Sequence, residues 1–116
     1  MKASDIVLTP IPQADGQMKN RPALLLCKMP PFDDALVCGI STQLRHEVVG
    51  FDELIVQQDD DFTGSGLVAD SLIRLGFLAV IPQSRLMGSI GAVGLNRHKR
   101  LLKNLSEHLL MGAEQR

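Results

Sequence analysis

Two short segments of this 116-residue chain carry side chains suited to binding a phosphate group. Arg21 stands directly before Pro22, and a residue before proline is held in an extended conformation, so we expect Arg21 at the start of a strand. Its guanidinium is planar, permanently charged and able to donate two hydrogen bonds to one phosphate. Ser41 and the two polar residues after it end the apolar run 35–40, where their side chains would leave the core. Taken alone, either feature is also typical of an ordinary strand end at the surface.

The glycines of the segment GSIGAVG, residues 88–94, could suggest a phosphate loop. Their spacing is not GxGxxG, no GK[ST] triplet occurs and no βαβ unit follows, so nucleotide binding is disfavoured. We expect turns and a close approach of a strand to a helix instead. The segment TGSG, residues 63–66, is interpreted as a mobile loop without a fixed ligand.

The remaining polar residues give little support for metal binding or nucleophilic catalysis. Zinc needs three or four convergent ligands, and no such spacing links the histidines and cysteines, which are His46, His98, His108, Cys27 and Cys38. The acidic triplet 59–61 lacks the alternation of a calcium loop, so we interpret it as a solvated turn. No serine lies in a recognisable nucleophile elbow. Both cysteines lie in apolar runs and are expected to behave as small hydrophobes.

Strands are predicted for most of the chain, because short runs rich in Val, Ile and Leu alternate with Pro, Gly, Asp and Asn clusters. We expect strands at residues 5–9, 22–28, 36–42, 48–56, 66–69 and 72–81. Their connections are too short for parallel crossovers, so the strands should be antiparallel. Residues 10–20 are expected to form a polar loop, because Pro10 and Pro12 are poorly suited to a central strand.

The period of the apolar residues changes near the end of the chain. From residue 97 to residue 111, one helical face carries Leu101, Leu102, Leu105 and Leu109, and Gly112 is placed to end the helix. An amphipathic helix needs an apolar surface, and the sheet is the one available. We therefore expect one domain over residues 1–116: a bent antiparallel β-sheet or barrel with a C-terminal α-helix packed on it.

Charge and composition limit the class of protein. The formal net charge is −1, which argues against a nucleic-acid binder that relies on overall charge but leaves a local basic patch open. With 45% hydrophobic residues the chain is not disordered, and no apolar run reaches the roughly 18 residues of a membrane span. The first residues do not form a signal peptide, so we expect a cytoplasmic protein that does not associate with membranes.

The charges are unevenly spread along the chain. Six acids and no base lie between residues 51 and 73, whereas the start of the predicted helix is basic, with Arg97, Lys99, Arg100 and Lys103. Such runs are usually solvated faces. The alternative is a dipolar surface that meets a partner of complementary charge.

The order of three segments followed by an amphipathic helix resembles a known family. They are DIVLTPIPQADGQMKNRPALLL (residues 5–26), LVCGISTQ (36–43) and LVADSLIRL (67–75), and the family is the PemK/MazF toxins of type II toxin–antitoxin systems. The resemblance implies an SH3-like antiparallel β-barrel of the PemK/MazF/CcdB type that forms a homodimer. It also implies a metal-independent endoribonuclease, without cofactors, that cleaves single-stranded RNA at short motifs and is blocked by a cognate antitoxin protein.

The resemblance assigns roles to particular residues. The family's catalytic arginine falls on Arg21 and its catalytic threonine on Ser41, with Thr42 beside it and a supporting aspartate at Asp70. Contacts to RNA are expected from Gln13, Lys19, Gln43 and Arg45. The acid–base residues that some members carry have no counterparts at Asp15 and Val68.

Two other functions fit the same fold. One is a non-catalytic module that binds RNA or protein without cutting, and the other is a topoisomerase inhibitor, against which the pairing of Arg21 with Ser41 argues. The chain has no Trp or Tyr, so RNA would be held through phosphates and base edges, with Phe32 and Phe51 as the nearest candidates for stacking.

Overall fold

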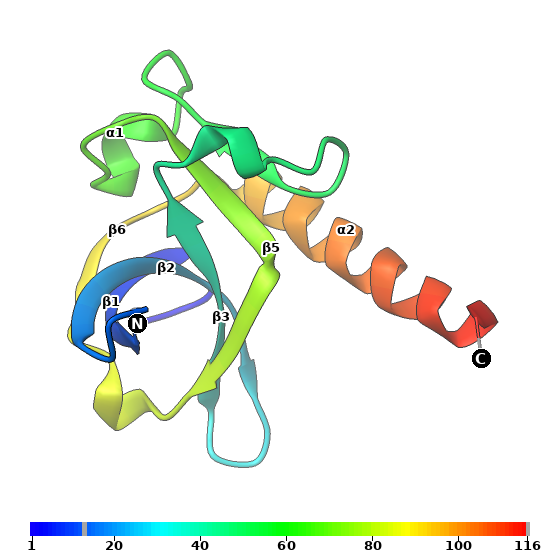
Figure 1. The fold of residues 1–116 in the computed structure, drawn as a ribbon, viewed down its shortest axis with the longest axis horizontal. Coiled ribbons are helices and arrows are strands. Elements are labelled where there is room, and N and C mark those ends of the chain that lie inside the picture. Colours follow the sequence, from blue (N-terminus) through cyan, green and yellow to red (C-terminus); the bar gives the residue numbers. More distant parts are fainter. Residues whose placement is uncertain (13, 116) are drawn as a thin grey trace.

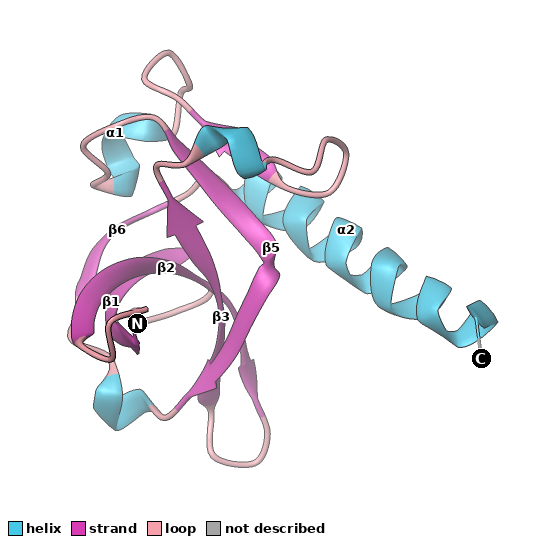
Figure 2. Cartoon of the chain, in the orientation of Figure 1, coloured by secondary structure: helices cyan, strands magenta, loops and turns pink. Residues whose placement is uncertain are grey.

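One six-stranded antiparallel sheet dominates the computed structural model, which describes residues 1–12 and 14–115 (Figure 1). The strands are β1 (Asp5–Pro12), β2 (Met18–Met29), β3 (Asp34–Ser41), β4 (Glu53–Ile55), β5 (Ser71–Ile81) and β6 (Ser89–Ala92). Their spatial order is β4-β5-β3-β2-β1-β6, and neighbouring strands in this order are antiparallel. The strands curl around an open ring (Figure 2), so the sheet forms a half-barrel. The prediction of a mainly β fold with a C-terminal helix is confirmed.

The C-terminal helix α2 (Leu95–Gly112) packs on one face of this sheet. Leu101 and Leu105 are buried with Ile6, Leu24 and Leu26 of the first two strands, as the helical spacing predicted. Leu109 continues the same stripe but is exposed, because the last turns of α2 extend past the sheet (Figure 1). The helix is followed by a 3-10 turn, η3 (Ala113–Gln115).

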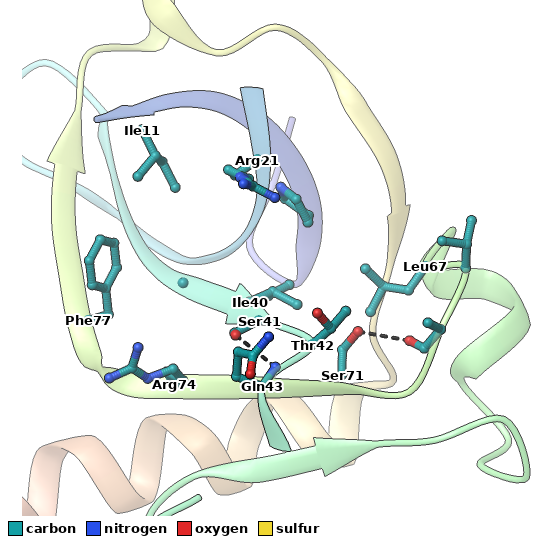
Figure 3. Close-up of a pocket in the computed structure, with 14 residues that line it drawn as sticks. Ile11, Arg21, Ile40, Ser41, Thr42, Gln43, Leu67, Ser71, Arg74 and Phe77 are labelled. Carbon is teal, nitrogen blue, oxygen red and sulfur yellow. Dashed lines mark hydrogen bonds between the residues drawn. The ribbon is translucent and has the colours of Figure 1, made fainter. Parts of the chain in front are cut away.

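Each strand of the first hairpin contributes to two cores, one on either face of the sheet. Side chains alternate along a strand, so the neighbours of Ile6 and Leu24 point away from α2. There Val7, Ala23 and Leu25 form a second buried cluster. The ring enclosed by the curled strands lies on the side of this second cluster, since Arg21 and Ile11 follow the same alternation and point into the ring (Figure 3).

The first predicted loop is shorter than expected, because Pro10 and Pro12 belong to β1. They pair with Asn20 and Met18 of β2. On its other side β1 pairs with β6 at residues 5–7, and Leu8 still donates to the Gly88 oxygen and accepts the Met87 N–H. From residue 9 onward, β1 is an edge strand within the described part of the chain. Proline is tolerated on an edge, because its missing N–H faces no partner strand.

Two predicted strands are wrong in whole or in part. Of residues 48–56, only Glu53–Ile55 form a strand, because Gly50 has a φ of 84° and the Asp52 carboxylate accepts the Val48 N–H at 2.9 Å, which closes a loop. Residues 66–69 form no strand. They follow a single helical turn, α1 (Phe62–Ser65), which ends at Gly66 with a φ of 75°.

The glycine-rich segments hold α1 against β6, a strand that the sequence analysis did not predict. A Cβ atom added at Gly91 would lie 2.3 Å from the Gly64 oxygen, and one at Gly66 would lie 2.1 Å from the Ile90 oxygen. Backbones can approach this closely only without side chains. The expected close approach of a strand to a helix is thus present, but TGSG is a packed helical turn and not a mobile loop.

The acidic segment and the basic helix start are joined through Arg97 and Arg100, so the prediction of solvated faces holds only for exposed side chains such as Asp60, Lys99 and Lys103. Arg97, at the start of α2, is 8% exposed and donates to Glu53 (3.0 Å), Asp59 (2.9 Å) and Asp61 (2.8 Å). It also donates to the Leu54 oxygen at 2.7 Å. The hydrogen bond from Arg97 holds the pKa of Asp61 below its usual value. This Arg97 cluster ties β4 and the acidic loop to the helix.

Candidate functional site

An open pocket of about 450 Å³ lies in the ring of strands, where the predicted catalytic residues meet (Figure 3). Four of the predicted residues line it, and they are Arg21, Ser41, Thr42 and Gln43. The other residues around it are Ile11, Pro22, Gly39, Ile40, Leu67, Val68, Ala69, Ser71, Arg74 and Phe77. Residues from β1, β2, β3, β5 and the loop before β5 therefore converge on one cavity.

Arg21 lies within β2 and not at its start, because the strand begins at Met18. It is paired with Thr9 of β1, and β3 begins to pair with β2 only at Ala23. The backbone of Arg21 is therefore fixed by one neighbouring strand, while β3 leaves the space beside it open. Its exposed side chain points into the ring from this position.

Ser41 is the last residue of β3, at the point where the chain turns away from the sheet. Its Oγ accepts the Gln43 N–H at 3.0 Å, which fixes the side chain beside the pocket. Because the backbone uses the oxygen as an acceptor, the hydroxyl proton is available to donate. The Gln43 Oε1 in turn accepts a hydrogen bond from the Arg45 guanidinium.

Arg74 is a second cation of the pocket and was missed by the sequence analysis. It pairs with Gly39 across the sheet, whereas Cys38 pairs with Leu78, so residues 75–77 form a bulge in β5. The bulge bends the strand and brings Phe77 over Gly39, where an added Cβ would lie 2.8 Å from the ring. The available signal was one charged residue inside the apolar run 71–81.

Several other predicted residues lie outside the pocket lining. The Asp70 carboxylate accepts the Gln57 N–H at 3.0 Å and does not line the cavity. Lys19 lies two residues before Arg21 and so faces the same side of β2, although it does not line the pocket either. Arg45 is exposed in the 3-10 turn η1 (Leu44–His46). Gln13 lies outside the described residues.

The aromatic residues predicted for stacking are also elsewhere. Phe32 is exposed in the β2–β3 hairpin, outside the pocket lining. Phe51 packs against the His108 ring, with a centroid distance of 4.9 Å. Phe77 lines the pocket instead and is 44% exposed, so a base could stack on it.

The electrostatics of the pocket favour an anion. Its described lining holds two arginines, three hydroxyl groups from Ser41, Thr42 and Ser71, and no carboxylate. The Ser71 hydroxyl donates its one proton to the Ala69 oxygen at 2.8 Å, so the hydroxyl donors open to an anion are Ser41 and Thr42. Guanidinium groups with hydroxyl donors form a typical phosphate-binding set.

The described part of the chain holds no cluster of metal ligands, and the buried cysteine Cys38 is not suited to act as a thiolate. No group of three His, Cys, Asp or Glu side chains is placed to hold a metal ion there. The His98 Nε2 is 2.8 Å from the Leu26 oxygen, so this ring is used in packing α2 on the sheet. Burial raises the pKa of the Cys38 thiol to about 12, which keeps it protonated and unreactive.

Comparison of the chain with protein-family models and with curated proteins gives no match. In residues 1–12 and 14–115, no helix is long and apolar enough to cross a membrane. The chemistry of the pocket and the ordered sequence segments are therefore what bears on function.

Proposed function

We propose that this chain is a toxin of a type II toxin–antitoxin system, a PemK/MazF-type endoribonuclease with an SH3-like barrel that cleaves single-stranded RNA without a metal ion. The observation that carries the proposal is the meeting of Arg21 and Ser41 in one pocket that has a second arginine and no carboxylate in its described lining. These two residues are 20 positions apart in the sequence, and the family resemblance had assigned both to the catalytic site.

The residues of the pocket suit the charge changes of this reaction. Without a metal, the 2′-hydroxyl next to the scissile bond attacks the phosphorus, and negative charge grows on the non-bridging oxygens. Arg21 and Arg74 line the pocket and would stabilise this charge by donating hydrogen bonds to those oxygens. Ser41 donates its hydroxyl proton to the same phosphate and orients it, and without an adjacent base it is not a nucleophile. Phe77 offers a face for a neighbouring base.

Partners of the proposed toxin follow from the family resemblance. A homodimer would place RNA in a groove across two copies, and a cognate antitoxin would compete for the same basic surface in the cytoplasm. An acidic antitoxin segment fits a pocket whose charged lining residues are both arginines. None of the described lining residues is acidic, so none of them would repel such a segment.

The direct test incubates single-stranded RNA with the protein in EDTA and compares the wild type with Arg21→Ala and Ser41→Ala. Removing a preorganised phosphate donor reduces the rate about a hundredfold or more, so Arg21→Ala should nearly abolish cleavage. Arg85→Ala is the matched control, because Arg85 is also exposed but lies outside the pocket lining. Absence of cleavage by the wild type, or equal cleavage by Arg21→Ala, would refute the nuclease.

A second candidate function is a module that binds RNA without cutting it. It is favoured by one observation: no histidine or carboxylate is among the described lining residues, so no general base faces the phosphate. Fluorescence anisotropy with a labelled RNA separates the two functions. Binding that depends on Arg21 but is never followed by cleavage would support the module over the enzyme.

A further inference from the structure

A second open pocket, of about 510 Å³, lies further along β5 than the pocket that contains Arg21. The two pockets share no described lining residue. Strands β1, β2 and β5 contribute to the second pocket, together with η2 (Gln83–Arg85), the 3-10 turn between β5 and β6 (Figure 1). Its described lining is apolar except for Thr9 and Arg85. A concave, mostly apolar cavity of this size with a few polar groups is typical of a small-molecule site.

Thr9 is the polar group at the buried end of this second pocket. The residue is 0% exposed, and its hydroxyl oxygen has no hydrogen-bond partner within residues 1–12 and 14–115. Thr9 lies opposite Arg21 in the sheet, so both side chains are on the same face, and Figure 3 shows Arg21 pointing into the ring. A buried hydroxyl without a partner costs free energy, and most such groups in native proteins are satisfied. The Thr9 hydroxyl therefore needs a polar atom from outside the described residues.

Arg85 is the charged group of the pocket and lies at its rim. Its side chain is exposed, and no carboxylate is among the described lining residues. A guanidinium in this setting can donate two hydrogen bonds to the carboxylate of a ligand. Met18 and Met87 also line the pocket and are 59% and 60% exposed. Methionine side chains adapt their shape to an apolar group, so these two can cover the body of a bound molecule.

We propose that this second pocket binds a small carboxylic acid that has an apolar chain and a hydroxyl group at the far end of the chain. The carboxylate binds Arg85, the chain packs against the apolar walls, and the terminal hydroxyl forms a hydrogen bond with Thr9. A phosphate ester fits less well, because it carries up to about two negative charges and meets a single arginine here. The inference concerns binding in this pocket and does not rest on RNA cleavage.

The test follows the methyl groups of the five methionines by NMR while acids are titrated into the full chain. The probes are the straight-chain fatty acids from butyrate to decanoate, and the same acids with a hydroxyl group on the last carbon. The methyl signals of Met18 and Met87 should shift. Met1, Met29 and Met111 lie outside the pocket lining and serve as internal controls.

The preference between the two kinds of acid reports on the Thr9 hydroxyl. We expect at least one hydroxyl-terminated acid to bind with a dissociation constant below about 1 mM, and about tenfold more tightly than the plain acid with the same number of carbons. A purely apolar cavity would show the opposite order, because burying a hydroxyl without a partner costs free energy.

Two variants separate the contacts at the two ends of the ligand. Thr9→Val keeps the branched shape without the hydroxyl, so it should bind the plain acid as the wild type does and lose the tenfold preference. Arg85→Gln should weaken the binding of both acids about tenfold. The matched control is Lys99→Gln, which removes one charge at an exposed position of α2 outside the pocket lining and should bind like the wild type.

Circular dichroism establishes whether each variant is folded. If Thr9→Val is not, the comparison of the two kinds of acid on the wild type decides. The proposal is overturned if no acid binds below about 1 mM, or if the shifts extend to all five methionines. Equal binding of the two kinds of acid would also overturn it and would mean that water satisfies Thr9. The same holds if Arg85→Gln binds as tightly as Lys99→Gln, or if folded Thr9→Val keeps the preference. Loss of the proposed RNA cleavage would change none of these results.

Discussion

Two groups of arginines occupy opposite electrostatic settings in this molecule. In the Arg97 cluster, a buried guanidinium donates to three carboxylates and a backbone oxygen, and Arg100 binds one of the same carboxylates. Arg21 and Arg74 both line the open pocket in the ring of strands, and no carboxylate is among the described residues around it. The carboxylates around the first group neutralise its charge, whereas the described lining around the second group contains no carboxylate and favours an anionic ligand.

The arginines of the Arg97 cluster therefore have a structural role, whereas the arginines of the pocket are suited to bind a ligand. In the sequence, four bases lie at the helix start within seven residues, 97–103. In the folded chain the two arginines of that run are engaged in ion pairs with the acidic segment. The local anion site is instead formed by single arginines from two different strands, β2 and β5.

The largest expected effect is the loss of stability in Arg97→Met. Removing one partner of a buried ion pair leaves the others uncompensated and typically costs about 3–5 kcal/mol. The same substitution at the exposed Arg21 should change the free energy of unfolding by no more than about 0.5 kcal/mol. Urea unfolding of both variants measures the contrast. Equal stability losses would remove the distinction between the two groups.

The next effect concerns the second arginine of the pocket. Arg74→Ala removes one charge-assisted hydrogen bond to the phosphate, which should lower the rate of RNA cleavage about tenfold, or about 1.4 kcal/mol. Thermal unfolding of the same sample shows whether the half-buried side chain also matters for folding. An Arg74→Ala enzyme with normal cleavage and normal RNA affinity would show that Arg21 acts without it.

The fold and the site differ in how much of each follows from local sequence. Strands such as β3 and β5 were predicted within two residues, because their apolar runs are bounded by turn residues. The Arg97 cluster joins residues 36 to 44 positions apart, and no local pattern specifies which acid meets which base. The sequence shows both the acidic segment and the basic start of the helix, but which acid pairs with which base depends on where α2 crosses the sheet.

The residues of the candidate site also could be predicted only in part from the sequence. Arg21 and Ser41 were assigned to the site by the family resemblance, and they do line one pocket. Arg74 reaches this pocket through the bulge of β5, which sets it opposite Gly39. Asp70 was placed in the site by the resemblance, yet its carboxylate binds a backbone N–H elsewhere. Register and side-chain direction decide these cases, and neither is encoded in residue order.

A smaller effect is expected in the pH dependence of stability. The Arg97 hydrogen bond lowers the pKa of Asp61 in the folded chain, so the carboxylate stabilises the fold above its unfolded pKa of about 3.9. This stabilisation is lost as the pH falls below that value through the lower folded pKa. Unfolding free energies from pH 7 down to about pH 3 should therefore fall less steeply for Asp61→Asn than for the wild type. Parallel curves would show that Asp61 contributes no such linkage.

The smallest effect is predicted for Asp70→Asn. In the resemblance Asp70 supports catalysis, but in the fold its Oδ1 accepts the Gln57 N–H at 3.0 Å and the residue is absent from the pocket lining. Asparagine keeps an oxygen that can accept the same hydrogen bond, so we expect RNA cleavage to change less than about twofold. The ratio of kcat/KM for the variant and the wild type measures this. A loss comparable to that of Arg21→Ala would mean that the loop before β5 rearranges on RNA binding and brings Asp70 to the phosphate. Asp70 would then belong to the binding site and not only to the fold.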